Sequence, residues 1–172
     1  MALTEEQMAE KLEEVKRVRV ELDPDPVIKG LASLNYKIAE IQIAKDHVSG
    51  LLLEAMKSTA EHEILHDIAK NTHDRQQDLL IATDPEVQAQ KSAEARSIHA
   101  RMKMPNLVLD LHHTEIALLK AQWYMKCLTL VASNLESTNS NLSRQITVIQ
   151  MDSALQGGNN LANRGTLKTF NS

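Results

Sequence analysis

The chain has 172 residues, a formal net charge of −4 at pH 7, and few glycines (5), prolines (4) and aromatic residues. A chain so poor in turn residues and in aromatic or branched strand segments is not a sheet protein, and we expect one all-α domain. No run of about 18 apolar residues is present and the acidic start lacks an apolar segment, so we expect neither a membrane-spanning helix nor a signal peptide.

Charge is unevenly distributed along the chain. Residues 1–25 hold eight acids and four bases, whereas residues 88–126 hold six bases and three acids. The basic segment is typical either of an ordinary solvated helix face or of a shallow surface that binds phosphates. Cys127 is the only cysteine, so no internal disulfide can form, and we expect a cytoplasmic protein.

The first element expected is a short helix over residues 1–22. Thr4 is placed to cap its N-terminus, and acidic residues follow in the first turn, where the helix dipole favours negative charge. The sequence DPDP at 23–26 then ends the helix, because a proline disfavours helical geometry in the residue before it.

Residues 26–156 are predicted to form a long antiparallel helical hairpin, similar to a coiled coil, with a turn near residues 82–86. At that turn Thr83 and Glu86 have the spacing of a capping box, and Pro85 is tolerated early in the next helix. Apolar residues recur along the first half of the hairpin at steps of three and four. They are Leu31, Leu34, Ile38, Ile41, Val48, Leu52 and Ala55, followed less regularly by Ile64, Leu65, Ile68 and Leu79.

The second half of the hairpin is predicted to be one helix to about Leu155, with a kink or a break at Pro105. Its later part carries a heptad stripe, whose apolar members are Leu128, Val131, Leu135, Leu142 and Ile149. Two helices of this length cannot bury their stripes fully against each other, so we expect the chain to form homo-oligomers through this stripe. Residues 157–172, rich in glycine and asparagine, are expected to be a flexible polar tail.

One short motif is typical of metal chemistry. Residues 62–66 read H-E-x-x-H, in which two histidines on one helix face bind zinc and the glutamate acts on the bound water. The third ligand is missing, because Thr72 stands where a metzincin has histidine. With a turn near residue 83, a milder metal site of His62, His66 and His99 is geometrically conceivable. We interpret all the histidines as surface or seam residues, and we expect no metal and no cofactor.

Residues 117–158 resemble the C-terminal end of the UvsY-type recombination mediators of tailed phages. The shared features are an aromatic pair after a glutamine (QWY, 122–124), the cysteine shortly after it, a stretch of small residues and leucines, and an IQ step followed by Met151 and a later glycine. The long hairpin upstream is similar in layout. The chain departs from the family pattern at EHEILHDIAKNTHDR (61–75), which does not match the basic stretch of the family's first long helix.

The resemblance implies a non-enzymatic accessory protein of homologous recombination. Such mediators assemble into rings, bind single-stranded DNA in the host cytoplasm, and help a recombinase displace the single-strand-binding protein. Lysine and arginine would neutralise the phosphates, with little reading of the bases. The candidates, chosen from charge, are Lys91, Arg96, Arg101 and Lys103. We interpret Trp123 and Tyr124 as packing residues at a subunit contact, with stacking on bases as the alternative.

The alternative function is that of a structural or scaffolding helical protein, such as a virion-assembly or adaptor component. Long imperfect apolar stripes with polar members suit it equally well, and it predicts oligomers without affinity for nucleic acid. Neither function is enzymatic. The sequence contains no glycine-rich phosphate loop, no nucleophile motif and no paired acid–base constellation.

Overall fold

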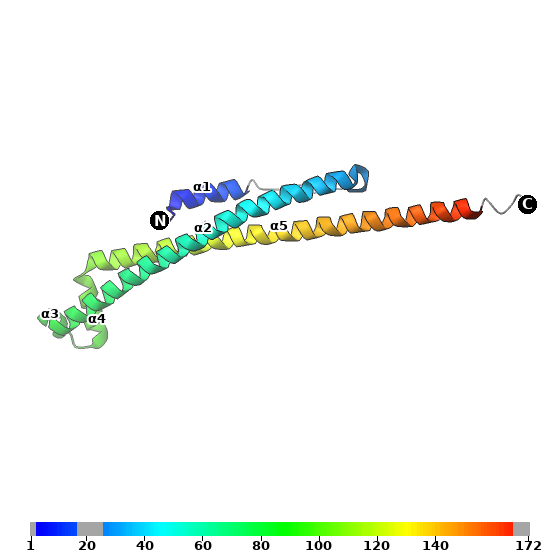
Figure 1. The fold of residues 1–172 in the computed structure, drawn as a ribbon. Helices are drawn as coiled ribbons and strands as arrows, with labels where there is room; N and C mark the ends of the chain where they lie inside the picture. Colours follow the sequence, from blue (N-terminus) through cyan, green and yellow to red (C-terminus); the bar gives the residue numbers. More distant parts are fainter. Residues whose placement is uncertain (1–2, 17–25, 167–172) are drawn as a thin grey trace, which may run out of the picture. The chain divides into compact units, whose positions relative to one another are not determined.

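The computed structural model describes residues 3–16 and 26–166. Within these ranges the chain is helical and contains no strand. The helices are α1 (Glu5–Lys16), α2 (Pro26–Thr83), α3 (Pro85–Gln88), α4 (Ala93–Met102) and α5 (Pro105–Thr166) (Figure 1). The two long helices α2 and α5 pack against each other, which confirms the all-α hairpin that the composition and periodicity predict.

The N-terminal helix α1 begins as the sequence predicts. The backbone N–H of Gln7 donates to Thr4 Oγ1 at 3.3 Å, and the N–H of Thr4 donates to Gln7 Oε1 at 3.0 Å, which is the reciprocal pattern of a capping box. Glu5 and Glu6 occupy the first turn, where the helix dipole favours them. The helix ends at Lys16, and residues 17–22 of the predicted helix lie outside the described residues.

The predicted cap at the hairpin turn is wrong by one residue. Asp84, not Thr83, caps α3: its Oδ1 accepts from the N–H groups of Glu86 at 2.9 Å and Val87 at 3.2 Å. Thr83 is still part of α2, and its hydroxyl donates to the carbonyl of Leu79 at 2.7 Å. The residue directly before Pro85 is extended, so its carboxylate reaches the free N–H groups of the next turn.

The predicted second helix is divided into three. α5 begins at Pro105, so the expected break at this proline is confirmed. An earlier break between α3 and α4 was not predicted; there Ser92 caps α4 by accepting from the N–H of Ala95 at 3.0 Å. α5 continues to Thr166, because no proline follows residue 105 to interrupt it. Residues 157–166 of the expected tail are therefore helical, and 167–172 lie outside the described residues.

The chain divides into two compact units. Unit 1 contains Met1–Val15 and Gly50–Thr129, and unit 2 contains Lys16–Ser49 and Leu130–Ser172. Each unit is held together by its own stretch of α2 and its own stretch of α5. The antiparallel pairing of α2 and α5 is seen in unit 1 at His66 of α2, whose Nδ1 lies 3.5 Å from Thr114 Oγ1 of α5. In unit 2 it is fixed by an ion pair between Lys45 and Glu136.

Unit 2 has a small aliphatic core. Leu34 and Ile41 of α2 and Leu142 of α5 are buried together. The flanking residues Ile38, Ile146 and Ile149 are partly buried against this core. Near its start, α2 leaves helical geometry at Gly30, where φ is 76° and ψ is 175°. Only glycine adopts this conformation without strain, so Gly30 is the point where the helix changes direction.

In unit 1 the interior face of α2 is made of small and polar residues. Ser58, Thr59 and His73 are buried there, together with Ala55 and Ala69. The predicted continuation of the aliphatic stripe through Ile64, Leu65, Ile68 and Leu79 is wrong, because all of these side chains are exposed. At 100° per residue, positions 55, 58, 62, 66, 69 and 73 share one face, which leaves 64 and 68 on the opposite face.

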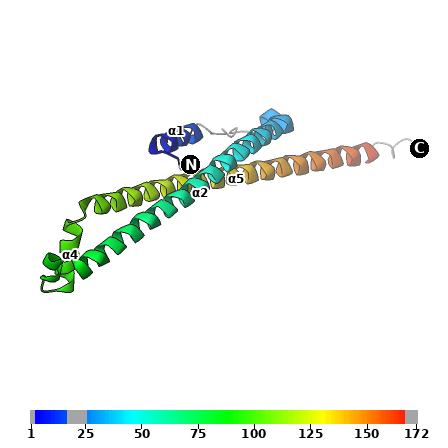
Figure 2. The same ribbon diagram turned by 60° about the vertical axis from the view of Figure 1, so that its left-hand side comes forward.

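The N-terminal segment lies against this interior face of α2. The backbone N–H of Leu3 donates to Ser58 Oγ at 3.0 Å, and Lys11 of α1 forms an ion pair with Glu54 at 2.8 Å. At the other end of unit 1, α3 and α4 connect α2 to α5 (Figure 2). Among the described residues no helix has a stretch apolar and long enough to cross a membrane.

Candidate functional site

The four basic residues predicted to contact nucleic acid lie on the α3–α4 connection of unit 1. Lys91 is exposed in the turn before α4. Arg96 is half-buried, and its Nε donates to the carbonyl of Gln90 at 3.2 Å. Arg101 is exposed near the end of α4, with its Nε 3.5 Å from Gln77 Oε1. All four predicted residues thus lie on the segment that joins α3 to α5.

Lys103 differs from the other three because carboxylates already hold its ammonium group. Its Nζ lies 2.7 Å from Asp84 Oδ2 and 2.6 Å from Glu86 Oε2. These hydrogen bonds raise the pKa of Lys103, and the bond from Lys103 together with the N–H donors of the α3 cap lowers the pKa of Asp84. Lys103 thus ties the start of α5 to the cap of α3, which is a structural role.

The segment around α4 remains basic even without Lys103. Residues 95–109 contain Arg96, His99 and Arg101 and no acidic residue. The acidic residues that flank this segment directly are Glu94, in the first turn of α4, and Asp110 of α5, whereas Asp84 and Glu86, farther along the chain, pair with Lys103. Lysine and arginine side chains at an exposed helix end can bind phosphates as point charges and as forks of donors.

The two histidines of the H-E-x-x-H motif contact the N-terminal segment and α5. His62 Nε2 is 3.4 Å from the carbonyl oxygen of Leu3, His66 Nδ1 is 3.5 Å from Thr114 Oγ1, and Glu63 is exposed. No group of three histidine, cysteine or acidic side chains able to hold a metal occurs among the described residues. His62 and His66 lie on the interior face of α2, whereas the residues between them are exposed.

The conceivable metal site of His62, His66 and His99 is not formed, because the register of the hairpin differs from the predicted register. A turn near residue 83 would pair positions 66 and 99. Instead, α3 and α4 occupy residues 85–102, and position 66 lies opposite Thr114. Two capped helices in the connection shift the register of the returning helix, which a single-turn hairpin does not anticipate.

The predicted oligomerisation stripe is used within the chain. Leu128 and Leu142 are fully buried and Leu135 nearly so. Ile149 packs beside the core of unit 2, and Val131 is partly buried. The heptad spacing identified a real packing face, but the partner of that face is the chain's own α2.

Sequence reasoning missed a second apolar face on each long helix of unit 1. On α2 it consists of Leu53, Met56, Ile64 and Ile68, and on α5 of Leu109, Ile116, Leu119 and Trp123, all exposed. Their spacing of three, four, seven and eight residues is itself a helical stripe, so the signal was present in the sequence.

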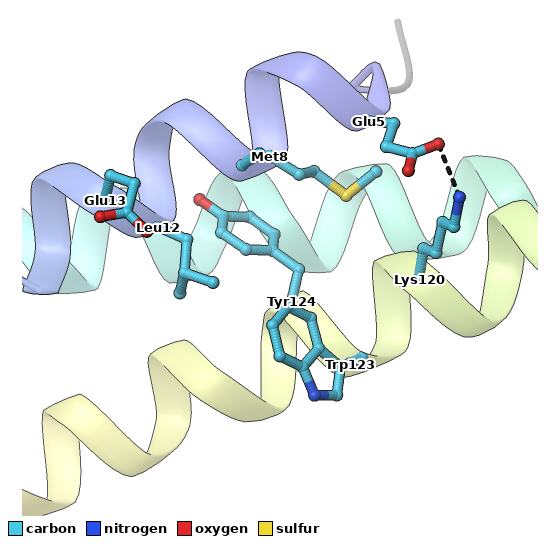
Figure 3. Close-up of a pocket in the computed structure, with 8 residues that line it drawn as sticks. Glu5, Met8, Leu12, Glu13, Lys120, Trp123 and Tyr124 are labelled. Carbon is cyan, nitrogen blue, oxygen red and sulfur yellow. Dashed lines mark ion pairs between the residues drawn. The ribbon is translucent and has the colours of Figure 1, made fainter.

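An apolar pocket lies between α1 and α5 in unit 1 (Figure 3). Its volume is about 340 Å³. It is lined by Glu5, Met8, Ala9, Leu12, Glu13, Lys120, Trp123 and Tyr124. At one side Lys120 Nζ lies 2.6 Å from Glu5 Oε2. Trp123 is 59% exposed in the single chain, whereas Tyr124 is buried against the chain itself.

Tyr124 has the most unusual environment in the pocket. Its side chain extends from α5 toward α1, while the indole of Trp123 points away from α1 (Figure 3). The side chain is 1% exposed, and its hydroxyl has no hydrogen-bond partner among the described residues. Burial, together with the negative charges of Glu54 and Glu14, raises the pKa of Tyr124 to about 12, so the hydroxyl stays protonated.

Comparison with known proteins adds no family to these observations: no family model, no curated protein and no solved structure matches the chain.

Proposed function

We propose that the chain is a non-enzymatic accessory protein of homologous recombination, which binds single-stranded DNA as a homo-oligomer and helps to load a recombinase. The observation that carries the proposal is the basic segment of residues 95–109, between Glu94 and Asp110, most of which lies on the connection between the two long helices of unit 1. The resemblance of residues 117–158 to UvsY-type mediators supplies the biological setting.

The proposed DNA contact uses Lys91, Arg96 and Arg101. Their positive charges would neutralise phosphates and release counterions, so affinity falls as salt rises. Lys103 contributes less, because Asp84 and Glu86 already satisfy its ammonium group. Binding of this kind is independent of sequence, as a protein that coats single strands requires.

The test is the fluorescence anisotropy of a labelled oligo-dT over a salt series. For single strands the slope of log K against log salt is about −0.7 per phosphate neutralised, so three cations give about −2 for each chain. Replacing Lys91 and Arg101 together by alanine is expected to make the slope less steep by about 1.4. The absence of binding at low salt would rule out the proposed function.

Two single variants serve as matched controls for the loss of charge. Lys57→Ala removes an equally exposed lysine from α2 and is expected to leave the slope unchanged. Lys103→Ala is expected to lower the melting temperature, because it frees the carboxylates of Asp84 and Glu86, but to change the slope little. An effect of Lys57→Ala equal to that of the double variant would show that only net charge matters.

The second candidate is a structural or scaffolding protein. It is favoured by the exposed apolar faces on α2 and α5 and by the ion pairs that occupy Lys103. It predicts concentration-dependent oligomers with no affinity for oligo-dT. Sedimentation velocity of the protein with and without the oligonucleotide separates the two candidates, because only the mediator co-sediments with DNA.

A further inference from the structure

We propose that copies of the chain dock head to tail, with an apolar and basic patch at the end of α4 in one copy filling the pocket between α1 and α5 in the next. We call this surface the α4 patch; it consists of Ile98, Arg101, Met102, Val108 and Leu109. The inference rests on the homo-oligomer of the proposed function and names the contact that builds it.

The pocket offers an apolar cavity beside an acidic helix. Met8, Leu12, Trp123 and Tyr124 supply the apolar walls. Residues 3–15 hold five glutamates (Glu5, Glu6, Glu10, Glu13 and Glu14) against the single base Lys11. Within the pocket the only base, Lys120, is bound to Glu5. The chemistry therefore favours an occupant that combines an apolar side chain with a positive charge.

The α4 patch has this chemistry. Met102 is 71% exposed and Ile98 is also exposed, although both are large apolar residues. Arg101 stands between them in sequence and is exposed as well, and residues 95–109 hold no acid. The patch continues onto α5 through Val108 and Leu109, which are exposed. Apolar surface and positive charge thus occur together on the same short segment.

The side chains of the two surfaces are complementary in chemical type as well as in charge. A methionine side chain is unbranched and polarisable, and its sulfur packs favourably at the edges of aromatic rings such as those of Trp123 and Tyr124. The guanidinium of Arg101 can lie over the exposed face of an indole or against a glutamate of α1.

The acidic surroundings favour a second copy over nucleic acid as the occupant of the pocket. Phosphates would approach the glutamates of α1 and be repelled, whatever stacking Trp123 offered. Each copy, by contrast, carries both surfaces on unit 1, and they are different surfaces. A contact between them is heterologous, so successive copies add in one direction and form a closed ring or a filament.

The test uses one uncharged substitution on each surface. Ala9 is exposed and lines the pocket, so Ala9→Phe fills the pocket with a ring. Met102→Ala removes the most exposed apolar side chain of the α4 patch. Each variant is studied by sedimentation velocity, alone and in an equimolar mixture, at a concentration at which the wild type is assembled. Far-UV circular dichroism checks the helices, and Ala9→Leu or Met102→Gln replaces a variant that has lost them.

The expected result has a distinctive pattern. Each variant alone is reduced to monomer, whereas the mixture forms a dimer and nothing larger, because the intact α4 patch of one variant fits the intact pocket of the other. The proposal is overturned if either variant assembles like the wild type, if the mixture of folded variants stays monomeric, or if the wild type itself is monomeric throughout.

The same variants separate this contact from the proposed function. Neither substitution changes a charge, but the contact covers Arg101 in the assembled protein. Each monomeric variant is therefore expected to bind oligo-dT with a salt slope steeper by about 0.7 per chain than that of the assembled wild type, because Arg101 becomes available to phosphate. Normal assembly of the wild type without any DNA binding would remove the mediator function and leave the contact standing. If the wild type binds DNA and both variants assemble like the wild type, the proposed contact is ruled out and the mediator function stands.

Discussion

At the scale of single residues, Asp84 joins two parts of the connection in unit 1. Its Oδ1 caps α3 and its Oδ2 accepts from Lys103, which precedes α5. Both interactions favour the charged carboxylate, and they lower the pKa of Asp84 below its ordinary value of 3.8. The position of the basic segment around α4 therefore depends on a negative charge.

Asp84→Asn tests this dependence. Asparagine keeps an oxygen for the cap but loses the charge that holds Lys103, so we expect the melting temperature at pH 7 to fall by a few degrees. Because the folded pKa is lowered, the stabilisation is present above about pH 3.8 and is lost as the pH falls through the folded pKa. The difference in melting temperature between the wild type and Asp84→Asn should therefore disappear in acid.

The measurement is a set of thermal melts followed by circular dichroism from about pH 7 to about pH 2. Asp110→Asn is the control, because Asp110 is an exposed acid of α5. The melting temperature of Asp110→Asn should equal that of the wild type at every pH. A gap for Asp84→Asn that persists unchanged in acid would mean that the charge of Asp84 does not stabilise the fold.

At the scale of the helices, two glycines of α2 are expected to respond in opposite ways to alanine. Gly30 has φ 76°, and Gly50 lies in regular helix; a Cβ would meet nothing within 4 Å at either position. Backbone strain therefore decides the outcome. We expect Gly30→Ala to lower the free energy of unfolding by about 1–3 kcal/mol and Gly50→Ala to raise it by about 0.5–1 kcal/mol.

Urea unfolding of the two variants measures this difference directly, and each serves as the control of the other because both add one methyl group to the same helix. Stabilisation by both substitutions would mean that residues 26–31 form a straight helix in solution. The 3.6-residue period cannot reveal the bend, since a glycine is compatible both with a tolerated helical position and with a change of direction.

The helical fold could be predicted because caps, prolines and apolar spacing act locally. Thr4 and Pro105 mark helix starts in the sequence and do so in the structure. The pairing of the helices could not be predicted in the same way. It depends on how many residues the connection uses, and the cap at Ser92 makes an extra helix where the sequence suggested a single turn.

The candidate site was predicted only in part for a related reason. Charge alone located the basic segment but could not reveal that Lys103 is held by Asp84 and Glu86. Likewise, α2 carries apolar residues on two faces, and the sequence does not say which face α5 covers. The pocket beside Tyr124 needs α1 in place, and such a contact between distant segments leaves no local pattern.

At the scale of the whole molecule, the chain divides into two units, each with buried apolar residues of its own. In unit 1, Tyr124 and Leu128 are buried, and in unit 2 Leu34 and Ile41 are buried around Leu142. Unit 2 is built from Lys16–Ser49 and Leu130–Ser172, and unit 1 from the remainder. Separate cores favour local opening of one unit while the other stays folded.

Leu142→Ala is expected to increase local unfolding of unit 2 without affecting unit 1. Removing a fully buried leucine costs about 2–5 kcal/mol, through lost burial and the cavity that remains, and here the loss falls on the core of unit 2. Hydrogen exchange followed by mass spectrometry should then show faster exchange over residues 31–49 and 130–155, with 50–83 and 105–129 unchanged. Val148→Ala, at an exposed position of the same helix, should leave both sets unchanged. Equal acceleration in both sets would instead mean that the long helices couple the two cores into one cooperative unit.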